Sequence, residues 1–375
     1  MIRLFVYEYL TGGGIDPELA GESALADLSA LIVEGRAMRD AIVHDARALD
    51  NVEVSFASSR LEAAAASRSP LSHYCAAPGE PMMDFVARVA RAHDYAWIVA
   101  PECDGLMLKL SDAVGESRWL GCTKEAIGIA SSKRATAALL AANGIAATPA
   151  LDPGALDVNA WAARSDGASG GANGAAEGWV VKPDDGAGGL DTYRYDNLAE
   201  ACDAYCARVA NGHRPVLQQW VDGEALSLSL ICGAHGARLI SINRQRIGVA
   251  DAASAGHAGR VVEFDGVDID QIDRDGPEGR VLETLAQKTA ALVPGLRGFV
   301  GIDVVWHADR GPVVIEVNPR VTMAYVGLSA RLGRNLAADV FAAHGVRGVF
   351  APEPKPQPQY GAAGTAPRFA GRTQL

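Results

Sequence analysis

The sequence predicts an α/β amino-terminal domain followed by a mixed α and β region. Strand-like and helix-like patterns alternate over residues 1–122, which is typical of a parallel sheet covered by helices. Farther along, residues 298–320 have the pattern of two apolar strands joined by a tight turn. A chain of 375 residues is also too long for one ordinary core, so we expect two or three domains.

The elements of the first domain follow from apolar runs and the turn residues between them. We expect strands over 2–9, 51–57 and 94–100, and helices over 25–49 and 106–114. Ligands on parallel sheets bind beyond the carboxyl ends of the strands. The expected substrate rim therefore consists of Glu8, residues 12–14, Glu102 and Asp104.

The middle of the chain alternates helices, strands and glycine-rich segments. In order, we expect a helix over 131–142, a flexible linker over 165–178, a strand over 179–182, a helix over 198–211, and strands over 215–221 and 238–247. Leu226, Leu228 and Leu230 alternate with serines after a turn at 222–223, which predicts a half-buried strand antiparallel to 215–221. The composition of residues 351–375 predicts a disordered tail.

Acidic and amide side chains interrupt the apolar hairpin at 298–320. Residues two apart on a strand share a face, so we expect Glu316 and Asn318 to point one way and Ile315 and Val317 the other. The alternative is a surface strand pair whose acids face water. The apolar flanking residues argue against it, because a strand buried on both faces does not carry unpaired acids.

The register of the hairpin decides whether its acids meet. If His307 pairs with Pro312 around a loop over 308–311, Asp303 lies opposite Glu316 on the same face. Two carboxylates that close repel each other, which a hard divalent cation such as Mg2+ offsets. The sequence therefore predicts Asp303, Glu316 and Asn318 as magnesium ligands. Arg320 follows the hairpin, where it could hold a phosphoryl or carboxylate group.

A second pattern suited to phosphate lies upstream. Lys182 ends an apolar strand and is followed at once by a turn that contains Gly186, Gly188 and Gly189. Glycines let backbone N–H groups close around phosphate oxygens without a side-chain clash. The order differs from the Walker pattern, in which the lysine follows the glycines. A solvated surface lysine is the alternative.

The composition of the chain indicates which partners and which cellular compartment to expect. The net charge of -11 argues against a nucleic-acid or anionic-membrane partner. We find no signal-peptide pattern and no apolar run long enough to cross a bilayer, so we expect a cytoplasmic protein. Six cysteines without paired spacing fit a reducing compartment. We expect Cys202 and Cys206 to pack in a core and not to bind a metal.

Together these parts resemble the ATP-grasp superfamily over about residues 123–345. They occur in the order Lys133, Lys182 with its glycine turn, the strand LQQWVDG, and the hairpin acids. The resemblance implies a Rossmann-like pre-ATP-grasp domain followed by a two-lobed ATP-grasp fold. It divides the chain into a first domain at 1–122, a small lobe at 123–219 with the insert 165–178, a carboxy-terminal lobe with the metal site at 220–348, and a tail at 349–375.

The resemblance also implies how ATP is held. Lys133 and Lys182 would contact the α- and β-phosphates, and the glycine turn would fold over the phosphates as a mobile flap. Asp303, Glu316 and Asn318 would ligate two Mg2+ ions, with Mn2+ as a substitute. The hinge strand that meets adenine through its backbone consists of Gln218, Gln219, Trp220 and Val221.

Three further residues receive roles at this site. Family members often place acids in and just beyond the hinge for the ribose hydroxyls, whereas this chain has glutamines there, so Glu224 is the nearest candidate. Arg244 and Arg246 share one strand face, from which a cation could reach the γ-phosphate. An exposed strand that happens to carry arginines is the alternative.

Within the superfamily, several segments look like tyramine-glutamate ligases of methanofuran-type cofactor synthesis: FVYEYLTGGG, LIVEGRAMRDAIVHDA, IVAPECDGLMLKL, LGCTKEAIGIASSK and INRQRI. This implies a carboxylate-amine ligase that forms an amide through an acyl phosphate, releases ADP and phosphate, and uses L-glutamate and tyramine. Arg320 would hold the acyl phosphate, and Glu8, Glu102 and Asp104 are candidate general bases. The alternatives are a small-molecule kinase, a ligase for other amino acids, and a nucleotide-binding regulatory module. A homodimer is also compatible with the sequence.

Overall fold

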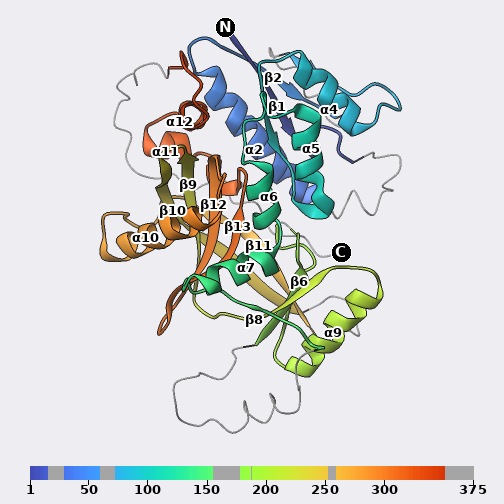
Figure 1. The fold of residues 1–375 in the computed structure, drawn as a ribbon, viewed down its shortest axis with the longest axis vertical. Helices are drawn as coiled ribbons and strands as arrows, with labels where there is room; N and C mark the ends of the chain where they lie inside the picture. The colour runs from blue at the N-terminus through green and yellow to red at the C-terminus, as the bar shows by residue number, and fades with distance from the viewer. Residues whose placement is uncertain (16–28, 60–71, 155–177, 187, 252–258, 351–375) are drawn as a thin grey trace.

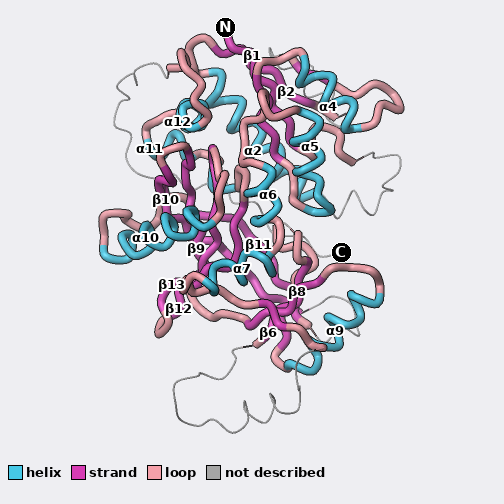
Figure 2. Tube along the Cα trace, in the orientation of Figure 1, coloured by secondary structure: helices cyan, strands magenta, loops and turns pink. Residues whose placement is uncertain are grey.

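The computed structural model describes residues 1–15, 29–59, 72–154, 178–186, 188–251 and 259–350. The expected linker at 165–177 and the expected tail at 351–375 lie outside these residues, as does the start of the helix expected at 25–49. Figure 1 shows the amino-terminal domain above a larger region of long strands. Strands run through the middle of the molecule, and most helices lie toward the outside (Figure 2).

The first domain is built on a four-stranded parallel sheet in the order β3-β2-β1-β4. Its strands are β1 (Ile2–Glu8), β2 (Val52–Ala57), β3 (His73–Tyr74) and β4 (Tyr95–Val99). Its helices are α2 (Ser29–Arg47), α4 (Met82–Arg91), the 3-10 turn η1 (Cys103–Gly105) and α5 (Leu106–Val114). The predicted α/β organisation is confirmed. The short strand β3 and the helix α4 were not predicted.

The central strand β1 is buried on both faces, and each face belongs to a different core. Leu4 and Val6 pack with side chains of α2, whereas Phe5 and Tyr7 pack with side chains of α4 and α5. The core on the α2 side also contains Phe341 from the carboxy-terminal helix α12 (Leu336–Ala343). The first domain therefore shares its core with the end of the chain.

The rest of the described chain is organised by a nine-stranded sheet in the order β13-β12-β9-β10-β11-β7-β6-β8-β5. The strands are β5 (Ala150–Leu151), β6 (Trp179–Pro183), β7 (Tyr193–Tyr195), β8 (Pro215–Gln219), β9 (Glu224–Gly233), β10 (Gly236–Asp251), β11 (Arg260–Asp268), β12 (Gly298–His307) and β13 (Gly311–Asn318). The helices are α6 (Lys124–Ala130), α7 (Lys133–Ala142), α9 (Leu198–Ala210), α10 (Pro277–Leu292), η2 (Met323–Tyr325), α11 (Leu328–Leu332) and α12.

The expected pairing of 215–221 with the strand that follows it is wrong. β8 pairs with β5 and β6, while β9 pairs with β10 and β12. The alternation of leucines and serines did not mark a half-exposed face either, because Ser227 and Ser229 are both buried. Asn243 provides one partner there: its Nδ2 donates to the Ser229 hydroxyl at 3.0 Å and to the backbone carbonyl of Ser227 at 2.8 Å.

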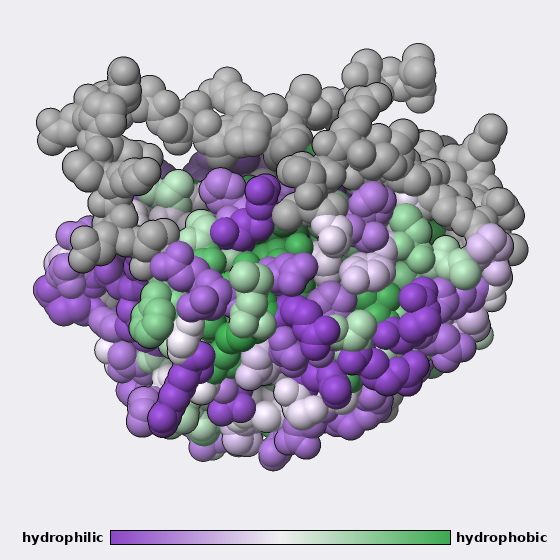
Figure 3. All heavy atoms as spheres, turned by 90° about the horizontal axis from the view of Figure 1, so that it is seen from above, coloured by the Kyte–Doolittle hydropathy of each residue, from purple (hydrophilic) through white to green (hydrophobic). Residues whose placement is uncertain are grey.

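Two observations bear on the general expectations. Among the described residues, no helix combines the length and the apolar character needed to cross a bilayer. All six cysteines are free; Cys202 is buried in a small core with Trp179 and Leu217, but Cys206 is exposed, so core packing explains only the first of the pair. In the view from above, apolar residues gather toward the centre of the face and hydrophilic residues dominate its lower edge (Figure 3).

Candidate active site

A cavity of about 830 Å³ is lined by residues of both sheets and of α2. Every predicted site residue lines it: Lys133, Lys182, Gly186, Gly188, Gly189, Gln218, Gln219, Trp220, Val221, Glu224, Arg244, Arg246, Asp303, Glu316, Asn318 and Arg320. Residues spread over almost two hundred positions therefore meet in one place.

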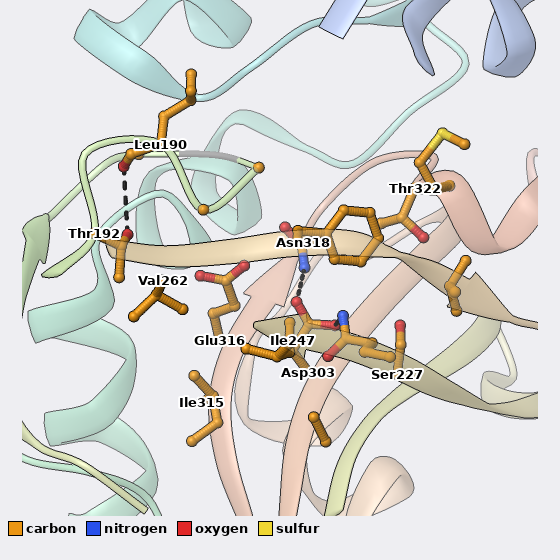
Figure 4. Close-up of a pocket in the computed structure, with 18 of the residues that line it drawn as sticks. Leu190, Thr192, Ser227, Ile247, Val262, Asp303, Ile315, Glu316, Asn318 and Thr322 are labelled. Atoms are coloured by element: carbon orange, nitrogen blue, oxygen red, sulfur yellow. Dashed lines mark hydrogen bonds between the residues drawn. The ribbon is translucent and has the colours of Figure 1, made fainter. Parts of the chain in front are cut away.

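Two lysines face the acids of the hairpin at the centre of the cavity. Lys133 Nζ lies 3.4 Å from Glu316 Oε2 and donates to Gly186 O at 2.6 Å. Asn318 Nδ2 donates to Asp303 Oδ2 at 3.1 Å, and Figure 4 shows this contact beside the carboxylate of Glu316. Lys133, Lys182 and Asn318 are buried. The surface-lysine alternative for Lys182 is therefore wrong.

The start of α7 is fixed to the glycine turn by Asp184, which follows Lys182 by two positions. Its Oδ2 accepts from Ser132 Oγ at 2.8 Å, and its Oδ1 accepts from Arg134 N at 2.8 Å. The Ser132 side chain in turn accepts from Ala135 N, which caps the helix. These bonds hold Lys133, on the first turn of α7, close to the strand that carries Lys182.

The charges at this centre shift each other's pKa values. Burial, and then the negative charge of Glu316, raise the pKa of Asp303 above its usual range. Burial also raises the pKa of Glu316, but the positive charges of Lys133 and Lys182 outweigh that effect and lower it. Burial lowers the pKa of Lys182 to about 8 despite the nearby Glu316. Two carboxylates and two lysines thus lie in one desolvated site, and the charge of each changes the pKa values of the others.

Asp303 does lie opposite Glu316, as predicted, but by a different register. His307 pairs with Gly311 and not with Pro312, because Gly311 takes a positive φ of 71° and closes the turn one residue early. A β-bulge between Asp303 and Val304 then restores the predicted pairing. The bulge also makes Ile315 line the cavity, so the expectation that Ile315 points away from it is wrong.

The glycine turn joins the two parts of the chain. Gly188 and Gly189 have φ values of 66° and 71°, which side chains rarely adopt. Before them, Asp185 Oδ2 accepts from Asp104 N at 2.9 Å and from Arg214 Nη2 at 2.6 Å. The turn is thereby tied to the rim of the first domain.

The predicted hinge follows β8 along one side of the cavity. The Trp220 N–H donates to Gly178 O at 2.9 Å, so this N–H is already used within the protein. The Trp220 indole donates to Asp222 Oδ1 at 2.6 Å and packs on the guanidinium of Arg194. Gln218 Nε2 donates to Thr148 O at 2.5 Å, while Gln218 Oε1 is buried without a partner among the described residues.

The predicted arginines differ in their surroundings. Arg244 and Arg246 are about half exposed and form ion pairs with Glu224 and Asp268, respectively. Arg320 is only 12% exposed in its side chain and holds Glu102 with two hydrogen bonds, Nε to Oε1 at 2.8 Å and Nη2 to Oε2 at 3.2 Å. Glu224, the expected ribose contact, is thus engaged by Arg244 in this structure.

Two of the three expected rim acids hold structural partners through their carboxylates. Glu8 accepts from Leu10 N at 3.2 Å and from Thr11 N and Oγ1 at 2.9 and 2.7 Å. Glu102 is bound to Arg320. The third, Asp104, contributes its backbone N–H to Asp185. The first two carboxylates therefore have established partners within the fold.

Sequence reasoning missed other residues of the cavity. Gln245 Nε2 donates to Asp303 Oδ1 at 3.1 Å, although strand alternation predicts that Gln245 faces away from its neighbours Arg244 and Arg246. A register shift between Gln245 and Ile247 accounts for this. Leu31, Glu34 and Met38 of α2 were also missed; their helical spacing was the available signal.

Within the part of the chain that the structure describes, no three His, Cys, Asp or Glu side chains cluster as metal ligands. The predicted metal ligands Asp303, Glu316 and Asn318 are two carboxylates and one amide, so they do not form a cluster of three such side chains. Its oxygen-bearing side chains are nevertheless of the type that Mg2+ takes when phosphates complete the coordination.

Comparison with known families agrees with this geometry. A sequence model of the ATP-grasp domain matches residues 130–324, and one of the pre ATP-grasp 3 domain matches residues 53–127. The chain is 29% identical over 237 residues to the tyramine–L-glutamate ligase of Methanocaldococcus jannaschii. That alignment covers 63% of this chain and 58% of the relative's length.

Solved structures share the fold. An ATP-grasp superfamily protein from Archaeoglobus fulgidus superposes with a TM-score of 0.61 at 22% identity, covering 92% of this chain and 89% of that one. The D-alanine–D-alanine ligase of Bacillus anthracis gives a TM-score of 0.59 at 15% identity, with 92% and 97% covered. The predicted order of a pre-ATP-grasp domain and an ATP-grasp fold is confirmed.

Proposed function

Because this chain belongs to the ATP-grasp family, we propose that it is an ATP-dependent carboxylate-amine ligase. It joins a carboxylate to an amine through an acyl phosphate and releases ADP and phosphate. The observation that carries the proposal is the meeting of Lys133 and Lys182 with Asp303, Glu316 and Asn318 in one cavity. Fixed positive charge and oxygen ligands together suit the transfer of a phosphoryl group.

The residues fit a divalent cation. Asp303 lies opposite Glu316 on the hairpin, and Asn318 contacts Asp303, so two carboxylates and an amide oxygen come from adjacent positions of one site. We propose that Asp303, Glu316 and Asn318 hold Mg2+, as two ions, with Mn2+ as a substitute. When bound, the metal supplies positive charge that stabilises the phosphates and the transferred phosphoryl group.

We assign the contacts to the phosphates, adenine and ribose of ATP from the positions of the residues in the cavity. Lys133 and Lys182 bind the phosphates, and the turn with Gly186, Gly188 and Gly189 covers them. The backbone of Gln219 and Val221 is the favoured part of the hinge for adenine, since the Trp220 N–H is used by Gly178. Glu224 stays the candidate for the ribose.

The chemistry has two steps. A carboxylate oxygen of the donor attacks the γ-phosphorus of ATP, the bond to the bridging oxygen breaks, and ADP leaves. The nitrogen of the amine then attacks the acyl carbon, phosphate leaves, and the amine loses a proton. Arg320 holds the acyl phosphate in this proposal, and Arg244 and Arg246 neutralise charge at the rim.

The name of the Methanocaldococcus relative, tyramine–L-glutamate ligase, supports L-glutamate as the carboxylate donor and tyramine as the amine acceptor. Methanofuran-type cofactor synthesis is part of the same proposal. The six free cysteines support a cytoplasmic location. The homodimer and the division at residues 122, 219 and 348 stay predictions.

The test is ADP release from MgATP with L-glutamate alone, tyramine alone, and both together. The ligase proposal expects release that depends on both substrates, equal amounts of ADP and phosphate, and one amide product. Release of AMP and pyrophosphate would contradict the acyl-phosphate step. A stable phosphate ester formed without an amine would identify a kinase, and binding of ATP without turnover would identify a regulatory module.

A further inference from the structure

The wall of the cavity that α2 contributes combines apolar side chains with one carboxylate. Leu31, Glu34 and Met38 lie three and four positions apart, so they share one helix face, and all three line the cavity. Gly35 sits on the same side, where a Cβ would lie 2.5 Å from Glu8 Cδ. The absence of a side chain at Gly35 therefore lets α2 approach the end of β1 closely.

Glu34 differs from most acids around the cavity in having no partner. Of the lining carboxylates in the described part of the chain, only Glu34 and Glu263 have no hydrogen bond or ion pair. Burial raises the pKa of the Glu34 carboxyl, and no nearby cation opposes that effect. A desolvated carboxylate without a partner is a place where a ligand cation gains most.

Glu34 lies on the side of the cavity that the glycine turn borders, where we propose that the phosphates bind. A Cβ built on Gly188 would lie 3.7 Å from Leu31 Cδ2, so the first turn of α2 reaches the glycine turn. Glu34 follows Leu31 by one helical turn. It faces the cavity from the first domain, whereas Glu316 and Lys182 enter from the other sheet.

The cavity wall beside the glycine turn, which the first turn of α2 reaches, is apolar. Besides Leu31 and Met38, the cavity is lined by Leu190, Val262 and Phe264 near the glycine turn, and a Cβ on Gly189 would lie 3.9 Å from Phe264 Cβ. Leu190 and Val262 appear in Figure 4 on one side of Glu316. A hydrocarbon group bound there would be removed from water, which favours an apolar ligand.

We propose that Glu34 binds the ammonium group of the amine acceptor and takes one proton from it, so that the neutral nitrogen can attack the acyl carbon, and that the apolar wall beside it selects acceptors with an aryl or alkyl body and one amino group. This inference rests on the proposed ligase function. It makes Glu34 a specificity-determining residue for the acceptor, while the lysines and acids that enter from the other sheet serve ATP.

The experiment compares two acceptors in purified full-length protein with MgATP and L-glutamate. Tyramine carries the ammonium that Glu34 would recognise, whereas hydroxylamine is small and largely uncharged at pH 7.5 and can trap an acyl phosphate without that contact. Glu34→Gln is expected to raise the KM for tyramine roughly 10- to 100-fold, the value of one lost charged hydrogen bond. ADP release with hydroxylamine and the KM for glutamate should stay unchanged.

The control is Asp40→Asn, which removes an exposed carboxylate from the same helix outside the cavity. It should leave the KM for tyramine unchanged, and Glu34→Gln should unfold at the wild-type temperature. Glu263→Gln tests the other unpaired acid. If that variant raises the KM for tyramine and Glu34→Gln does not, the ammonium lies at β11 and the inference is overturned.

The remaining outcomes separate this inference from the ligase proposal. An unchanged KM for tyramine in Glu34→Gln overturns the inference. The inference is also overturned if this variant has a raised KM for L-glutamate and an unchanged KM for tyramine. A wild-type protein that uses hydroxylamine but none of tyramine, phenethylamine and butylamine also overturns it, while the ligase proposal stands. A wild-type protein without glutamate-dependent ADP release in hydroxylamine refutes both.

Discussion

Replacing Lys182 by Met should stabilise the protein in the absence of nucleotide. Lys182 is only 7% exposed, and burial lowers its pKa from 10.5 to about 8. At about 1.4 kcal/mol for each pKa unit, this corresponds to roughly 3 kcal/mol of cost for the charged form. Met has a similar length and no charge. We expect the free energy of unfolding at pH 7 to rise by about 1 to 3 kcal/mol, since the site relaxes around the new side chain.

The pH dependence gives a second measure of the same effect. Between pH 8 and pH 10.5 the unfolded chain holds a proton on Lys182 that the folded protein has lost. Stability contributed by this residue therefore rises with pH across that window and is lost as pH falls through 8. The advantage of Lys182→Met over the wild type should be full at pH 7 and shrink toward pH 10.5.

The assay is urea unfolding of both proteins at several pH values, with and without MgATP. Lys288→Met, at an exposed position of α10, is the control and should change stability by less than about 0.5 kcal/mol. With MgATP the order should reverse, because the wild type binds the phosphates more tightly and gains more from binding. A less stable Lys182→Met without nucleotide, or an unchanged KM for ATP, would refute the reasoning.

Three further changes test other contacts of the site. Glu316→Gln should lower kcat by at least about 100-fold at saturating Mg2+ while near-ultraviolet circular dichroism stays unchanged, because the charge opposite Lys133 is lost; near-normal kcat would sink the metal assignment. Glu102→Gln should reduce both kcat and, by about 2 kcal/mol, the free energy of unfolding, since the mostly buried Arg320 loses its carboxylate partner; equal stability to the wild type would contradict this. Tyr325→Phe should cost about 1 to 3 kcal/mol of stability with kcat retained, because buried Asp45 loses the hydroxyl that donates to it at 2.8 Å; a fall in kcat without loss of stability would argue for a functional role.

Local patterns were enough to predict the parts of the site that lie within one element. Lys182 ends an apolar strand and Gly186 follows it, so both features are visible within a few residues. The same holds for Lys133 at the start of α7. The prediction of such residues does not depend on how the strands pair, and the structure places these residues as expected.

Strand partners could not be predicted in this way. The serines of β9 have the alternation of a half-exposed strand, but both are buried, and Asn243 on β10 donates to the Ser229 hydroxyl and to the Ser227 backbone carbonyl. That partner is supplied by the long-range order of the nine-stranded sheet. Glu34 was missed for a similar reason, because a glutamate on an amphipathic helix is most often solvated, and only the fold, which brings the first turn of α2 beside the glycine turn, makes it a cavity residue.

The bulge in the terminal hairpin shows how one local irregularity positions the chemistry. The turn sets His307 opposite Gly311, and without a bulge this register would pair Asp303 with Ile315 and Glu316 with Ile302. Ile302 is fully buried in the core, and opposite residues share a face, so the Glu316 carboxylate would then enter an apolar interior. The extra residue at the bulge returns Glu316 to the face of Asp303. The charged pair therefore depends on a turn and a bulge acting together, and a change that alters only one of them should move Glu316 out of the cavity.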